Sequence, residues 1–169
     1  MSPRDIAAER EYDMEDGQVS KLDPHIRMGE TLEVEVVRAF LRSLQALDAE
    51  AAAGLLSESF VLTQSGLPSV RGRAAFRHVF GLAASLLSNF DLVGLEIAGN
   101  GEVVLTARRE FVKVGPLEMV IWAFGRFEVQ SGEIVRMHDY FDFGNLAFAG
   151  LRGLAGIVVP PLRPSRKKP

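Results

Sequence analysis

The stretch VVLTARREFVKV, residues 103–114, places charged side chains in the middle of a run of apolar and β-branched residues. Such a run is typical of a β-strand, in which successive side chains point to opposite faces of a sheet. Arg108 and Glu110 therefore share one face of this strand. Burying a charge costs several kcal/mol per ion unless the charge has a partner, so we expect these two side chains to be paired.

A second strand pattern, at residues 133–142, supplies a candidate partner. From Val135 to Phe141 its odd positions are apolar except for Asp139, whereas its even positions are mostly polar. If the two faces coincide, Arg108 lies between Glu110 and Asp139, because one guanidinium can hydrogen-bond two carboxyls at once. One carboxyl could then hold a proton as a general acid while the other acts as a general base. Spacing alone leaves a second interpretation open, since Arg–Glu pairs two apart on a strand more often form surface ladders.

Four strand patterns follow one another in this half of the chain. They cover residues 90–98, 102–114, 117–129 and 133–142, and the segments GNGE and QSGE between them are tight-turn signals. The apolar Trp122 and Phe124, inside the third strand, are expected in the core.

Helical patterns flank the strands. Apolar residues recur at helical spacing from Thr31 to Leu47, which predicts a first long helix, and Asp48 is a candidate N-cap of a short helix. Residues 60–65 are strand-like, and residues 73–88 are expected to form a second long helix. The apolar stripe expected on that second helix consists of Phe76, Val79, Phe80, Ala83 and Leu87. Helices followed by hairpin-connected strands predict an α+β fold, in which a curved antiparallel sheet carries helices on its concave face and encloses a pocket.

The ends of the chain differ from this central part. Residues 1–29 are polar and without periodicity, and residues 163–169 are basic and Pro-rich, so we expect a disordered leader and a disordered tail around a single domain at 30–162. After Phe143 comes a Gly/Ala/Leu-rich helix, in which the segment GLRGLAG (150–156) indicates close packing rather than a phosphate loop.

Composition excludes several classes of protein. The net charge of −3 argues against a nucleic-acid binder, and the absence of cysteine excludes disulfides, thiolate metal sites and a cysteine nucleophile. The three histidines, His25, His78 and His138, have no metal-ligand spacing, so no metal and no cofactor is expected. We expect a cytoplasmic protein, because the first residues do not form a signal peptide and no apolar run is long enough for a membrane span.

Three segments resemble the limonene-1,2-epoxide hydrolase family, and its mycobacterial-type members in particular. They are LTARREF, GPLEMVIWAFGRFEVQSGEIVRMHDYFDF and GLRGLAGIVVPPL. The resemblance implies the cone-shaped α+β fold of the nuclear transport factor 2-like and SnoaL-like superfamily. It also implies a one-step, metal-free opening of an epoxide, in which Asp139 is the base, Arg108 the bridge between the carboxyls, and Glu110 the acid in place of the family's aspartate.

The chain departs from the family where the attacking water is held. The family uses a Tyr and an Asn two residues apart on the first strand, and Leu62 and Gln64 stand at these positions here. The apolar wall of the pocket is expected to comprise Met119, Ile121, Ala123, Met137, Phe141, Val79, Phe80 and Leu82.

The favoured hypothesis is therefore a hydrolase that opens a small hydrophobic epoxide with water, forming a diol. A cyclase that opens an epoxide with a hydroxyl of the same substrate is an alternative, since it needs no well-held water. A non-catalytic module that binds hydrophobic ligands is the third possibility. The resemblance also implies a homodimer formed through the outer face of the sheet.

Overall fold

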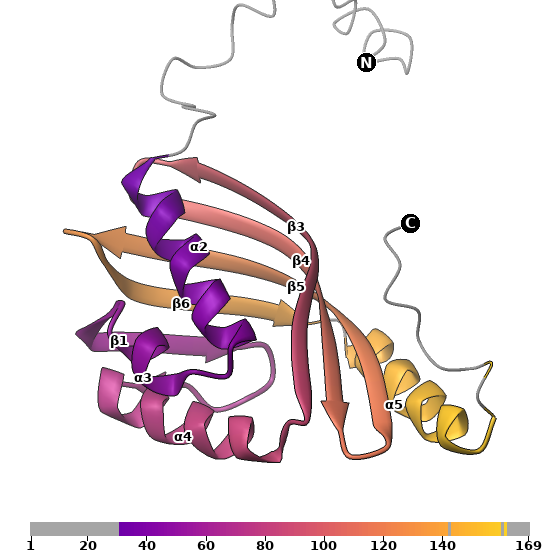
Figure 1. Ribbon diagram of the computed structural model, residues 1–169. Helices are drawn as coiled ribbons and strands as arrows, with labels where there is room; N and C mark the ends of the chain where they lie inside the picture. The colour runs from indigo at the N-terminus through magenta and orange to yellow at the C-terminus, as the bar shows by residue number, and fades with distance from the viewer. Residues whose placement is uncertain (1–30, 142, 160, 162–169) are drawn as a thin grey trace, which may run out of the picture.

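The computed structural model describes residues 31–141, 143–159 and 161. The predicted leader and tail lie outside these residues. A mixed, curved sheet carries helices α2, α3 and α4 on one side, and α5 lies apart from them at the far end of the sheet (Figure 1). The α+β class predicted from the sequence is confirmed.

The sheet has six strands in the order β2-β1-β6-β5-β4-β3. They are β1 (Leu56–Gln64), β2 (Val70–Arg71), β3 (Asn89–Asn100), β4 (Val103–Val114), β5 (Leu117–Gln130) and β6 (Glu133–Phe141). The last four match the predicted strands to within two residues. The sheet is antiparallel, as predicted, except that β1 pairs with β6 in parallel. The short strand β2, inside the turn-rich loop after β1, was not predicted.

Helix α2 (Leu32–Gln45) begins where the sequence predicts, with Thr31 as its N-cap. The Thr31 side chain accepts a hydrogen bond from the backbone N–H of Val34, which satisfies one of the free donors of the first turn. The buried side of the helix presents Val37, Phe40 and Leu41 to the concave face of the sheet. There Phe40 meets Phe127 of β5 at a ring distance of 6.1 Å. This contact fixes α2 over the central strands.

Helix α3 (Ala49–Ala53) is capped by Asp48, as predicted, and is short because the chain enters β1 at Leu56. Helix α4 (Arg73–Leu86) buries less than its sequence pattern suggested. Phe76 is buried and Phe80 packs against the core, whereas Val79 and Ala83 of the predicted stripe are exposed.

Helix α5 (Phe143–Val158) packs along β5. A Cβ atom on Gly153 would lie 2.6 Å from the carbonyl oxygen of Glu118 and 2.8 Å from Leu117 Cδ1. The glycine thus allows the helix to approach the strand closely, which is the role expected for the segment GLRGLAG.

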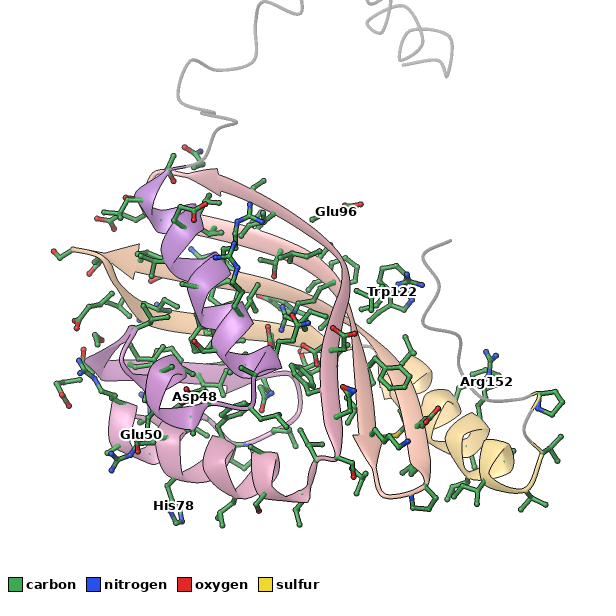
Figure 2. All side chains as sticks on the ribbon, viewed as in Figure 1. Asp48, Glu50, His78, Glu96, Trp122 and Arg152 are labelled. Atoms are coloured by element: carbon green, nitrogen blue, oxygen red, sulfur yellow. The ribbon has the colours of Figure 1, made fainter. Side chains whose placement is uncertain are left out.

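The outer face of the sheet corrects one prediction. Trp122 is 44% exposed and Phe124 is 53% exposed, so neither belongs to the core. Both occupy even positions of β5, whose odd positions from Ile121 to Val129 are buried. Trp122 projects away from helices α2, α3 and α4 (Figure 2).

Candidate active site

The register of three neighbouring strands brings the predicted catalytic residues together. Thr106 of β4 is the partner of Gly125 of β5, which in turn is the partner of Asp139 of β6. Arg108 and Glu110 follow on the same face of β4, where even-numbered residues from Val104 to Glu110 are buried. Side chains from β4 and β6 therefore converge over β5 on the concave face.

Arg108 uses each of its three nitrogens in this cluster. Its Nε donates to Oε1 of Glu110 at 2.9 Å, and its Nη2 donates to Oδ2 of Asp139 at 2.8 Å. Nη2 also lies 2.9 Å from Oε1 of Glu110. Its Nη1 donates to Oγ1 of Thr106 at 3.0 Å. The arrangement expected from strand alternation, a guanidinium between two carboxyls, is present.

The cluster is removed from water. Arg108 is 1% exposed, and both carboxyl-bearing residues are buried as well. Charged hydrogen bonds of this kind are stronger inside a protein than in water, because the local dielectric constant is lower. A surface ladder, the alternative interpretation of the Arg–Glu spacing, would be solvated, so the burial argues against it.

Burial also shifts the titration of all three groups. It raises the pKa of Glu110, and the negative charge of Asp139 adds to that rise, while Arg108 opposes it without cancelling it. Burial likewise raises the pKa of Asp139 against the opposing effect of Arg108. Burial acts to lower the pKa of Arg108, but the two carboxylates outweigh it and the pKa is raised. These directions favour a charged Arg108 and carboxyl groups that keep a proton more readily than free ones do.

The two oxygens of Asp139 have different surroundings. Oδ2 accepts the hydrogen bond from Arg108, whereas Oδ1 is buried and accepts no hydrogen bond from the described residues. A buried carboxylate oxygen without a partner is unusual in proteins, and active sites are one place where such atoms occur. Oδ1 is thus the atom of this cluster that is free to accept a proton.

The first strand approaches the cluster from the other side of β6. Gln64 is the register partner of Asp139, and Leu62 is the partner of Met137 across the parallel β1–β6 pair. Leu62 and Met137 are buried in the core, while Gln64 is partly exposed. Gln64 is therefore the neighbour of Asp139 across the β1–β6 pair, and the residue two positions before it on β1, Leu62, is apolar.

The residues predicted for the apolar wall divide into two groups. Ile121, Ala123 and Met137 are buried, and Met119, Phe141 and Phe80 are partly buried. Val79 and Leu82 of α4 are about half exposed. Lining of a substrate pocket by these residues stays a prediction.

Sequence reasoning missed two members of the cluster, Thr106 and Gly125. Thr106 is the third partner of the guanidinium, and Gly125 lies beneath it. A glycine isolated inside a strand pattern is a signal of close approach, and the segment FGRFEV around Gly125 carries that signal.

His138 and Tyr140 lie on the outer face, where their rings stack at 4.1 Å. This agrees with the expectation that His138 does not pair with Asp139. Among the described residues, no group of three or more His, Asp or Glu side chains is arranged to hold a metal ion. Within the same part of the chain, no helix has both the length and the apolar character needed to cross a membrane.

The chain thus has the cone-shaped α+β fold, with a buried carboxyl–guanidinium cluster on the concave face of its sheet. Residues 31–152 match the model of the limonene-1,2-epoxide hydrolase catalytic domain, and the chain belongs to this family.

Two matches from Mycobacterium tuberculosis, one in sequence and one in structure, support this membership. The chain is 35% identical over 133 residues to epoxide hydrolase EphG, a match that covers 75% of this chain and 85% of that protein. The structure of an LEH-like epoxide hydrolase from M. tuberculosis superposes with a TM-score of 0.74 at 30% identity, covering 80% of this chain and 99% of the other. A Shewanella denitrificans protein described as a SnoaL-like polyketide cyclase, at 11% identity and a TM-score of 0.65 over 71% of this chain and 97% of that one, shares the fold.

Proposed function

We propose that this protein hydrolyses a small hydrophobic epoxide to a diol by general acid–base catalysis. The observation that carries the proposal is a buried guanidinium, Arg108, held between two carboxyls that have raised pKa values. Membership of the limonene-1,2-epoxide hydrolase family supports the reaction type. The following steps assign roles to the individual atoms.

Asp139 is the general base. Its Oδ2 is fixed by Arg108, and its Oδ1 is buried without a hydrogen-bond donor among the described residues. Oδ1 takes a proton from a water molecule while the water oxygen forms a bond to an epoxide carbon. The hydrogen bond from Arg108 holds the carboxylate in one orientation, and orientation of this kind supplies several kcal/mol of a barrier.

Glu110 is the general acid. Its Oε1 is occupied by Arg108, so its second oxygen carries the proton that is transferred to the epoxide oxygen as the C–O bond breaks. The charge of Asp139 helps to raise the pKa of Glu110, which keeps this acid protonated when the base is ionised. The environment thus separates the two carboxyls into an acid and a base.

Arg108 stabilises the negative charge of the site throughout the reaction. Before the reaction Asp139 is negative and Glu110 is neutral, and afterwards these protonation states are exchanged. Because the guanidinium contacts both carboxyls, it stabilises the negative charge in either place. Proton exchange with solvent then restores the starting state.

Gln64 is the residue that we propose helps to place the water, since it is the neighbour of Asp139 on β1. Leu62, two residues earlier on the same face, offers only apolar surface. This substitution is the observation that favours the second candidate function, an epoxide-opening cyclase. A cyclase uses a hydroxyl group of its own substrate as the nucleophile and does not need a second water ligand.

The proposal includes a homodimer formed through the outer face of the sheet. Leu105, Trp122, Phe124 and Tyr140 are large side chains exposed on this face, and large exposed apolar patches often mark interfaces. A cytoplasmic location is also part of the proposal, supported by the absence of cysteine.

The test is the activity of Asp139→Asn on a panel of apolar epoxides. This change keeps the shape of the side chain and an acceptor for Arg108 but removes the base, so we expect turnover to fall by about 10²–10⁴-fold. Asp91→Asn is the matched control, because Asp91 lies on β3 and bonds the exposed Gln45. Near-normal turnover by Asp139→Asn would remove Asp139 from the mechanism.

A further inference from the structure

The guanidinium of Arg108 has to cross a strand to reach Asp139. β5 lies between β4 and β6, so these two strands are separated by two strand spacings, or roughly 9.5 Å. The register partners of Arg108 and Thr106 on β5 are Ala123 and Gly125, the two smallest residue types. The side chain of Arg108 can therefore pass over β5 at Ala123 and Gly125, where little side-chain volume stands in its way.

Gly125 leaves no room for a side chain. A Cβ atom at this position would lie 2.7 Å from Nη1 of Arg108, 2.7 Å from Oγ1 of Thr106 and 2.8 Å from Cε2 of Phe127. Phe127 is fully buried and packs on Phe40, so it cannot move aside easily. Even an alanine would therefore push the guanidinium or Thr106 away from the strand.

Among the described residues, Thr106 is the partner of the guanidinium that does not titrate. Its Oγ1 accepts from Nη1 at 3.0 Å, and the residue is buried. The two other partners, Glu110 and Asp139, exchange their protonation states during the proposed reaction. The hydrogen bond from Nη1 to Thr106 therefore keeps the same strength while the charges of Glu110 and Asp139 change.

We propose that Thr106 and Gly125 are positioning residues for epoxide opening, which together brace Arg108 so that both carboxyls keep their orientation through the catalytic cycle. The inference rests on the proposed acid–base function. It adds two residues that act through Arg108 rather than on the substrate.

The first experiment compares Thr106→Val with Thr106→Ser. Valine keeps the volume and loses the hydroxyl, whereas serine keeps the hydroxyl. We expect Thr106→Val to lower kcat about tenfold with little change in KM, because an interaction that acts on the reacting geometry affects kcat and kcat/KM together. We expect Thr106→Ser to recover most of this loss.

The pH profile supplies a readout that packing alone would not move. Arg108 lowers the pKa of Asp139 against the effect of burial, so a less firmly held guanidinium should shift the acid limb of kcat/KM to higher pH. Thr106→Val should show this shift and Thr106→Ser should not.

Gly125→Ala has a matched control on the same sheet. Gly99 of β3 is also crowded, since a Cβ there would lie 2.7 Å from Cγ2 of Val34 of α2, and its other near neighbours, Thr31 and Val104, lie outside the catalytic cluster. Both alanine variants should lower the melting temperature. Measured where each is folded, only Gly125→Ala should lose kcat, by tenfold or more.

Three results would overturn the inference. They are a wild-type kcat and acid limb in Thr106→Val, equal losses in the Val and Ser variants, or equal kcat in Gly125→Ala and Gly99→Ala. If Gly125→Ala fails to fold, the comparison of Thr106→Val with Thr106→Ser decides the inference.

If the wild type opens no epoxide, the proposed function fails. The positioning of Arg108 by Thr106 can then still be tested by NMR of the Arg108 guanidinium. Rotation about its Nε–Cζ bond should be faster in Thr106→Val than in Thr106→Ser, and equal rates would contradict the brace.

Discussion

Replacing Glu110 by glutamine separates the chemical role of this residue from its packing. Glutamine keeps the length of the side chain and an oxygen that can accept from Nε of Arg108, but it cannot transfer a proton to the epoxide oxygen. Loss of a general acid typically costs 10²–10⁴-fold, so we expect kcat to fall by about that factor.

The same substitution should change how the free energy of unfolding depends on pH. The pKa of Glu110 is raised in the folded protein, mainly by burial, so folding favours the neutral form. This contribution is complete below the unfolded pKa of about 4.3 and is lost as pH rises through the raised folded value. Glutamine carries no charge, so the variant should gain stability relative to wild type between pH 5 and pH 8. The gain is about 1.4 kcal/mol for each unit by which the pKa is raised.

Urea unfolding of both proteins at pH 5 and pH 8 measures this difference directly. Glu128→Gln is the control, because a hydrogen bond from Arg126 lowers the pKa of Glu128. Its contribution is present above the unfolded pKa and is lost only as pH falls below it, so the control should show no change between pH 5 and pH 8. A Glu110→Gln variant that loses stability relative to wild type as pH rises, or that keeps near-normal kcat, would refute the reasoning.

Three further predictions follow from the site and the outer face. Leu62→Tyr combined with Gln64→Asn restores the family's water ligands and should raise diol formation on a simple epoxide by roughly tenfold, or ~1.4 kcal/mol; with a cyclase, diol would instead appear at the expense of a cyclic product. Phe124→Glu should shift the sedimentation coefficient from dimer to monomer, and a wild type that sediments as a monomer would contradict the proposed interface. The pH profile of kcat/KM should be bell-shaped, with apparent pKa values that belong to the Asp139–Glu110 pair. Its acid limb should lie above the ordinary range of aspartate pKa values. A profile that is flat on the alkaline side would argue against Glu110 as the proton donor.

Alternation along β4 and β6 was enough to predict the core of the site. Arg108, Glu110 and Asp139 interrupt otherwise apolar faces, and a charge in such a place requires a partner, so the sequence itself indicates the pairing. The glycine-containing turns between the strands allowed the bounds of β3 to β6 to be predicted to within two residues.

Other features depend on information that periodicity does not contain. The segment MVIWAF is apolar on both faces, so nothing local to it shows that Trp122 points outward. The parallel pairing of β1 with β6 joins segments about seventy residues apart, and no turn signal specifies it. Thr106 and Gly125 become part of the site only through the register of β4, β5 and β6, which two isolated strand patterns do not fix.

The most direct test of the central claim is a single-turnover reaction in oxygen-18 water with enzyme in excess over an apolar epoxide. If Asp139 acts as a base on water, the diol formed in this first turnover carries one oxygen-18 atom and Asp139 carries none. An unlabelled diol, with the label recovered in Asp139 after proteolysis and mass spectrometry, would show that the carboxylate attacked the epoxide itself. That result, or an unlabelled cyclic ether as the product, would contradict the account.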